Sequence, residues 1–363
     1  MRQKKRRMPV LLLLFIILIS VTLVLCAVVA GIWLHGRSAL RNKPVVAPTL
    51  DLTQSSEPQE EQPSGQLQDA QLDSYTVRRN GKYYRYKEGL VNLLLMGVDA
   101  DEKPSEPHPY GGDYQADVVM LAVLDTVRDE MTLISISRDT MCDITILNDD
   151  GTEQGIAHAQ LALSYSYGDG LSVSCELCRE AVSTMFQGLE IDGYAAYFLG
   201  GVETLNDALG GVTVTVPEGL PSTSAFRGMT AGESVSLTGR QARAFIQWRE
   251  EDETGNSNRM QRQKQFLLSA ISQMRRQVSS NPTSALSLYN AISDYVLTDL
   301  DLSRLLYLAT EAASMRFSDD ILRVQTSGER ISDEQHLELT VDGEALTDLI
   351  LSVFYEEFTP ENG

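Results

Sequence analysis

The chain has 363 residues, and its 30 basic and 50 acidic residues give a formal net charge of −20 at pH 7. Eight of the basic residues and no acid lie in residues 1–43, so the remainder is even more acidic. This charge argues against a nucleic-acid partner. The length allows one large domain or two small ones, together with extensions.

The first element is an uncharged apolar stretch over residues 10–34. It is longer than the roughly 20 apolar residues that cross a bilayer as a helix. A cleaved signal peptide, with an apolar core of about 7 to 15 residues, is the less favoured alternative. Five positive charges precede the stretch and three follow it, so residues 1–9 are expected to be cytoplasmic. We expect a single-pass transmembrane helix in the cell membrane and an extracellular remainder.

The next segment, residues 35–74, is rich in Pro, Gln, Ser and Glu from Asn42 onward. Such a composition buries too little apolar surface to offset the entropy of ordering. It predicts a flexible extracellular tether. No polar linker interrupts residues 75–360, which are expected to form one domain.

Buried strands are predicted by three apolar runs, over residues 91–99, 117–125 and 131–139. Each run has a charged residue near one end, namely Asp99, Asp117 and Arg138. Strand ends are where an open α/β sheet presents its ligands. We therefore expect these three side chains to share a site, although either acid could instead simply cap a loop.

In the later part of the chain, segments whose apolar residues have helical spacing alternate with segments that have the spacing of a strand. Helices are expected over 175–187, 201–209, 238 onward, 257–278, 302–315 and 342–358, and strands over 194–198, 212–216, 321–326 and 336–340. Thr238 is a plausible helix cap. Such alternation indicates an α/β fold whose central sheet is covered by helices on both faces.

An arginine cluster opens the predicted helix over 257–278. Arg259, Arg262 and Gln263 share one face of its first two turns, and a helix amino terminus favours anions. With the carboxylates of Asp99 and Asp117 as ligands for Mg²⁺, the guanidiniums suggest a magnesium-bound pyrophosphate. The alternative is that these arginines pair with nearby acids on a solvated surface.

Three cysteines follow the apolar stretch, at positions 142, 175 and 178. The helical spacing around Cys178 favours a core residue. A disulfide from Cys142 to Cys175 or Cys178 and a redox role of the C-x-x-C pair stay open.

Several blocks, taken in order, resemble the LytR-CpsA-Psr family. They are residues 92–99, 116–125, 133–140, 162–170, 191–217, 237–249 and 255–267. The resemblance covers residues 90–280, which would be the core, with 281–360 as a carboxy-terminal α/β extension. It implies a central mixed sheet and a membrane-anchored phosphotransferase. Such an enzyme moves a teichoic acid or capsular polysaccharide from an undecaprenyl-pyrophosphate carrier to peptidoglycan. A non-catalytic polyprenyl-phosphate-binding regulator or scaffold is the alternative.

The resemblance also implies roles for individual residues. Asp99 and Asp117 match the acids that hold Mg²⁺, and the catalytic set would be Asp99, Arg138 and Arg259. The pyrophosphate contacts would be Arg138, Arg249, Arg259 and Gln263, with Arg262 in the same block. Ala100 and Asn256 stand where the family usually has Arg and Asp, which leaves the general base open.

Overall fold

The computed structural model describes residues 30–50, 74–107, 112, 114–221, 223–248, 255–317, 320–328 and 337–359. Most of the predicted transmembrane helix over residues 10–34, part of the predicted tether and Arg249 lie outside these ranges. Within the described ranges, no helix combines the length and the apolar character needed to cross a bilayer.

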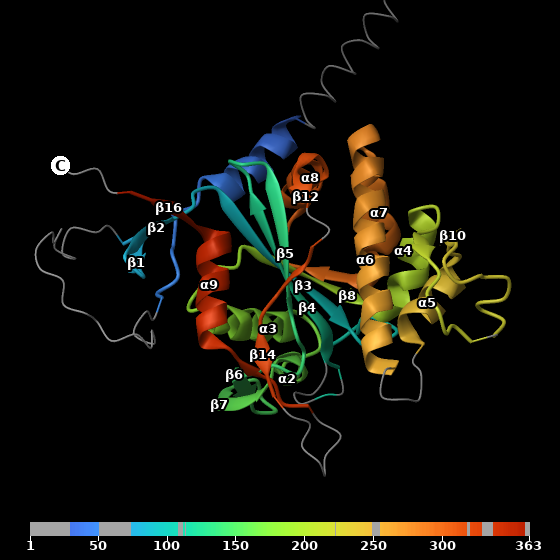
Figure 1. Ribbon diagram of the computed structural model, residues 1–363, viewed down its shortest axis with the longest axis horizontal. Helices are drawn as coiled ribbons and strands as arrows, with labels where there is room; N and C mark the ends of the chain where they lie inside the picture. The colour runs from blue at the N-terminus through green and yellow to red at the C-terminus, as the bar shows by residue number, and fades with distance from the viewer. Residues whose placement is uncertain are drawn as a thin grey trace, which may run out of the picture.

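A seven-stranded mixed sheet forms the centre of the fold (Figure 1), with strand order β11-β8-β3-β4-β5-β12 and β13 also paired with β5. The strands are β3 (Leu90–Val98), β4 (Ala116–Asp125), β5 (Glu130–Ile136), β8 (Gly193–Phe198), β11 (Val296–Thr298), β12 (Arg316–Phe317) and β13 (Leu322–Arg323). Strands β3, β4 and β5 are antiparallel, whereas β8 runs parallel to β3. The expectation of a central mixed sheet is therefore confirmed.

Helices cover both faces of this sheet, as the alternation of elements predicts (Figure 1). Successive side chains of β4 point to opposite faces, so Leu121 and Val123 join one core cluster, while Ala122 and Leu124 join another. The first cluster is completed by α2 (Leu161–Ser166), α3 (Ser172–Met185) and α9 (Gly343–Phe354). The second is completed by α8 (Leu302–Ser314) and by the helix over residues 30–41.

A third core cluster extends the molecule beyond β8. It joins α4 (Val202–Ala208), α5 (Gly239–Gln247), α7 (Ser284–Ile292), the ribbon of β9 (Thr213–Thr215) and β10 (Ser234–Ser236), and one flank of α6 (Gly255–Ser280). Helix α5 begins after Thr238, as predicted, and the Thr238 backbone N–H donates to Gln241 Oε1 at 2.9 Å. The strand predicted over 212–216 forms, but in this ribbon and not in the main sheet.

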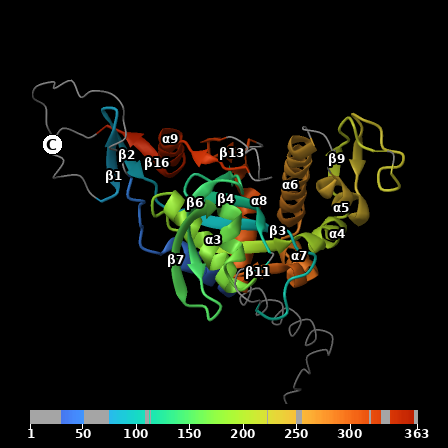
Figure 2. The same cartoon turned by 90° about the horizontal axis from the view of Figure 1, so that it is seen from below.

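A small sheet lies at the end of the molecule opposite α5 and β9 (Figure 2). It consists of β1 (Thr76–Arg79), β2 (Lys82–Tyr86) and β16 (Tyr355–Phe358). The helix predicted over 342–358 therefore ends at Phe354, and its expected last turn is wrong. The reason is tertiary, because β2 offers an edge with which Tyr355–Phe358 pair antiparallel.

Several further elements complete the fold. The sequence did not predict the hairpin of β6 (Met141–Leu147) and β7 (Glu153–Gln160). The short strands β14 (Thr326–Ser327) and β15 (Thr340–Val341) pair with each other, and the 3-10 turns are η2 (Leu199–Gly201) and η3 (Ser293–Tyr295).

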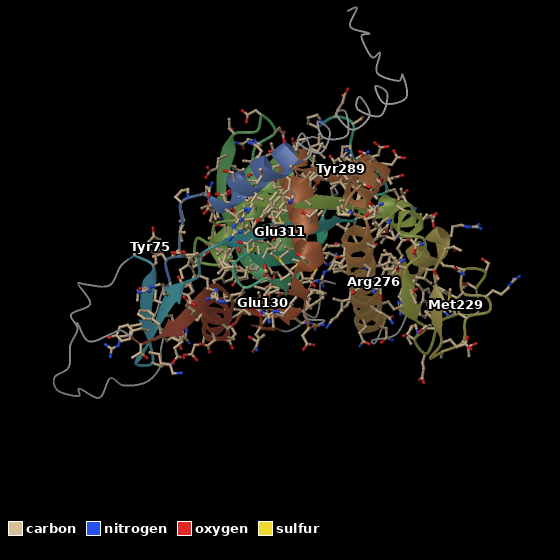
Figure 3. All side chains as sticks on the ribbon, turned by 90° about the horizontal axis from the view of Figure 1, so that it is seen from above. Tyr75, Glu130, Met229, Arg276, Tyr289 and Glu311 are labelled. Atoms are coloured by element: carbon tan, nitrogen blue, oxygen red, sulfur yellow. The ribbon has the colours of Figure 1, made fainter. Side chains whose placement is uncertain are left out.

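Residues 30–50 pack against the domain. The helix over residues 30–41 lies beside α8, which carries Glu311 (Figure 3), and Trp33 Nε1 donates to Thr310 Oγ1 at 2.9 Å. Lys43 forms an ion pair with Asp192. Residues 35–50 of the predicted tether are thus in contact with folded structure.

Candidate functional site

The site is built at one edge of the central sheet. Strand β3 ends at Val98, which lies opposite Ala116 at the start of β4. Strand β4 in turn pairs antiparallel with β5, and Val119 lies opposite Ile136 at the end of β5. The end of β3, the start of β4 and the end of β5 therefore meet, and the sheet brings Asp99, Asp117 and Arg138 to one edge.

Arg138 is held by two carboxylates at this edge. Its Nη1 donates to Asp117 Oδ1 at 2.5 Å, and its Nε lies 3.6 Å from Asp139 Oδ1. Partial burial alone would lower the pKa of Arg138, but the charges of Asp117 and Asp139 outweigh it and raise that pKa. The guanidinium stays charged, and its 38% exposed side chain leaves part of it open to solvent.

Asp99 lies in an unfavourable place for a carboxylate. Although the residue is exposed overall, desolvation of its carboxyl group and the negative charge of Asp117 raise its pKa above the usual value. The positive charges of Arg138 and Arg259 act in the opposite direction. The net shift of the pKa is upward, so the ionised carboxylate of Asp99 is less favourable here than in water.

Arg259, in the first turns of α6, lies near enough to Asp99 for its positive charge to oppose the upward shift of the pKa of that carboxyl. Its charge acts directly on Asp99, although the two residues are far apart in the sequence. The sequence analysis also predicted a contact between segments that are far apart in the chain, because it placed the strand ends and the start of a helix in one site. The sheet brings Asp99, Asp117 and Arg138 to one edge, and the charge of Arg259 acts on Asp99 there.

Arg262 and Gln263, which the sequence predicts as pyrophosphate contacts, are engaged with the backbone of α5. Arg262 is only 3% exposed, and its Nε donates to the Phe245 carbonyl oxygen at 3.0 Å. Its Nη2 donates to the carbonyl of Trp248, whose ring centroid lies 4.8 Å from the guanidinium carbon. Gln263 Nε2 donates to the Ile246 carbonyl oxygen at 3.2 Å. Both side chains thereby satisfy carbonyl groups that the end of α5 leaves without helical partners.

The sequence prediction missed one charged pair near the site. Arg243 on α5 forms an ion pair with Asp101, two residues beyond Asp99. The pair is partly exposed, and such pairs contribute about 0–1 kcal/mol to stability. Since 142 residues separate the partners, no local sequence signal connects them.

The residues present fit a magnesium ion that is also bound by phosphate. In the described part of the chain, no group of three or more His, Cys, Asp and Glu side chains could hold a metal ion. Mg²⁺ commonly takes only one or two carboxylates and completes its shell with water and substrate phosphates. Asp99 and Asp117 supply two such oxygen donors, and their mutual repulsion is what a divalent cation would relieve.

The three cysteines belong to the core. Cys142, Cys175 and Cys178 are buried free thiols within one hydrophobic cluster. Burial raises the pKa of Cys142 to about 12 and that of Cys178 to about 11. The interpretation of Cys178 as a core residue is confirmed, and thiols that stay protonated are poor nucleophiles.

Comparison with known proteins identifies relatives. Residues 51–348 match the model of the LytR_cpsA_psr family. The polyisoprenyl-teichoic acid–peptidoglycan teichoic acid transferase TagU of Oceanobacillus iheyensis is 29% identical over 249 residues, or 68% of this chain and 71% of the relative.

Solved structures share the fold. A Streptococcus agalactiae protein aligns with a TM-score of 0.57 at 19% identity, over 73% of this chain and 86% of its own. B. subtilis TagV aligns with a TM-score of 0.55 at 21% identity, over 74% and 96%. The family match extends over most of the chain and includes every described element of the site, so this protein belongs to the LytR-CpsA-Psr family.

Proposed function

We propose that this protein is a transferase that moves an anionic glycopolymer, a teichoic acid or a capsular polysaccharide, from an undecaprenyl-pyrophosphate carrier to peptidoglycan. The observation that carries the proposal is the convergence of Asp99, Asp117, Arg138 and Arg259 at one sheet edge. The relative in Oceanobacillus iheyensis, named as a transferase of teichoic acid to peptidoglycan, supports the choice of polymer and acceptor.

The chemistry assigned to these residues is mainly electrostatic. A hydroxyl of peptidoglycan attacks the phosphorus attached to the glycopolymer, and the bond to the carrier's other phosphate breaks, releasing polyprenyl phosphate. Arg138 and Arg259 stabilise the negative charge that develops on the phosphate oxygens. Asp117 orients Arg138 through their ion pair. Asp99, whose pKa is raised, is the candidate acceptor of the hydroxyl proton.

The same acids would hold the metal ion. Asp99 and Asp117 would bind Mg²⁺, which when bound would add positive charge next to the phosphate oxygens. The alternative assignment of Asp99, as a metal ligand only, would leave the proton to another base.

The proposed location is the cell membrane. The apolar stretch over residues 10–34 would span the bilayer once, and its last residues, 30–34, belong to the helix that packs against the domain. Residues 1–9 would lie in the cytoplasm and the catalytic domain outside the cell. This arrangement would bring the domain to a substrate whose carrier is itself a membrane lipid. The length of the apolar stretch and the positive charges before it support this placement.

The test measures transfer of a polyprenyl-pyrophosphate-linked glycan to peptidoglycan by the full chain. Arg138→Ala and Arg259→Ala should each lower the transfer rate by about 10²- to 10³-fold, because one preorganised donor to a developing charge contributes that much. Arg316→Ala is the matched control. Arg316 is 74% exposed and pairs with Glu130 at the other end of β5, so its loss should leave the rate unchanged.

The products distinguish the other candidate functions. Binding of the lipid pyrophosphate with no release of lipid phosphate would favour the non-catalytic regulator or scaffold. Release of lipid phosphate at the same rate without peptidoglycan would indicate hydrolysis. Full transfer activity in both arginine variants would refute the roles proposed for Arg138 and Arg259.

A further inference from the structure

A third arginine approaches the site from an element that supplies neither Arg138 nor Arg259. Arg243 lies in the middle of α5, and its Nη2 forms an ion pair with Asp101 Oδ1 in the loop after β3. Its Nε also donates to Gln247 Oε1, one turn later, at 3.2 Å. The guanidinium is therefore positioned by one group from its own helix and one from the loop of the site.

The backbone of this loop is tightly packed. The Gly200 N–H donates to the Ala100 carbonyl oxygen at 3.3 Å. A Cβ atom added at Gly200 would overlap the carbonyl oxygen of Asp101. The turn η2 thus fixes the backbone of Asp101, two residues from Asp99. The ion-pair partner of Arg243 therefore has a fixed backbone position next to the site.

The exposure of the pair argues against a purely structural role. The side chains of Asp101 and Arg243 are 69% and 31% exposed. Exposed ion pairs of this kind add little to stability. Position 100 is Ala, so the loop itself carries no cation between Asp99 and Asp101. The fold brings Arg243 from α5 to this loop, where it pairs with Asp101.

We propose that Arg243 is a further pyrophosphate-binding residue, which Asp101 holds beside the site until a phosphate takes its place. The inference rests on the proposed function. The two phosphates of a pyrophosphate together carry more negative charge than the single carboxylate of Asp101, and their oxygens match the fork of donors that a guanidinium offers. On binding phosphate, the Arg243 guanidinium would exchange a weak partner for a stronger one.

The experiment measures binding of geranylgeranyl pyrophosphate, with Mg²⁺, to the detergent-solubilised full chain by calorimetry. Arg243→Ala and Arg243→Gln should each weaken binding about 10- to 100-fold, which corresponds to the loss of a hydrogen bond to a charged group. Geranylgeranyl monophosphate should be affected less, so the preference for the diphosphate should fall. Arg243→Lys, which keeps the charge without the fork, should restore part of the affinity.

Two controls separate binding from folding. Arg240→Ala removes an exposed arginine from the same helix and should leave binding unchanged. Asp101→Asn frees the guanidinium and should not weaken binding. The melting temperatures of the Arg243 variants should stay close to that of the unchanged protein, because a partly exposed ion pair adds little to stability.

The outcomes also separate this inference from the proposed function. If the unchanged protein binds the diphosphate and both Arg243 variants bind it equally well, the role of Arg243 is refuted while the proposed function stands. If the unchanged protein does not bind the diphosphate, the proposed function fails, and the inference fails with it.

Discussion

At the scale of single residues, Asp99 combines the roles proposed for it with an unfavourable environment. Its pKa is raised, first by desolvation and then by the charge of Asp117. The folded protein therefore binds the Asp99 proton more tightly than the unfolded chain does. The resulting contribution to stability is present at acid pH and is lost as the pH rises through the raised pKa. At neutral pH the ionised carboxylate destabilises the ligand-free fold.

This predicts that Asp99→Asn stabilises the ligand-free protein at pH 7. The increase in melting temperature should be small, because Asp99 is exposed, and it should shrink towards zero as the pH falls to 4. Thermal melts over a pH series measure the effect. Asp149→Asn, at an exposed loop position, is the control. A variant that melts below the unchanged protein at pH 7 would contradict this account of Asp99.

Part of this site could be predicted from the sequence because three of its residues are marked by the residues next to them in the chain. Asp99, Asp117 and Arg138 each adjoin an apolar run, and antiparallel pairing of those runs leaves little freedom in where their ends lie. The pair of Arg243 and Asp101 carries no such signal, since only the packing of α5 against the rest of the fold connects them.

At the scale of elements, the junction of α5 and α6 sets the position of Arg259. Arg262 ties α6 to the last turn of α5 through the carbonyls of Phe245 and Trp248. Helical spacing alone put Arg259 and Arg262 on one face. It could not show that one guanidinium is buried against a neighbouring helix end while the other acts on Asp99.

Arg262→Ala is therefore expected to destabilise the fold by about 1–3 kcal/mol, because buried carbonyl groups lose their donors. Urea denaturation of the variant measures this loss. Arg276→Ala removes an exposed arginine of the same helix (Figure 3) and should change stability far less. Equal stability of the two variants would show that Arg262 does not hold this junction.

Helix and strand boundaries were predicted well where one apolar periodicity runs through the element. They were predicted poorly where pairing with another strand determines the structure. The apolar periodicity of α6 and α8 gave both helices nearly their observed lengths. The segment Tyr355–Phe358 is a strand because β2 pairs with it. On strand β7 the face toward the core carries only small residues, among them Ala157 and Ala159, while the apolar Ile156 lies on the exposed face. Its sequence therefore lacks the alternation of large apolar and polar residues that marks a half-buried strand.

At the scale of the whole molecule, the sheet with helices on both faces followed from the alternation of elements. The packing of residues 30–50 did not, because the composition of a segment does not show what it packs against. Asp192 accepts from both the side chain of Lys43 and the Asn92 backbone N–H near the start of β3, whereas Asp99 follows the end of that strand. At about 3.3 Å per residue, roughly 20 Å separate this docked segment from the site.

The central claim is that Asp99, Asp117, Arg138 and Arg259 surround one pyrophosphate group. A crystal structure of the protein with a polyprenyl pyrophosphate and Mg²⁺ tests it most directly. We expect both phosphates at the edge formed by the end of β3 and the start of β4, with Arg138 and Arg259 within hydrogen-bonding distance of their oxygens. Phosphates bound at another surface, with both guanidiniums making no contact to them, would contradict the claim.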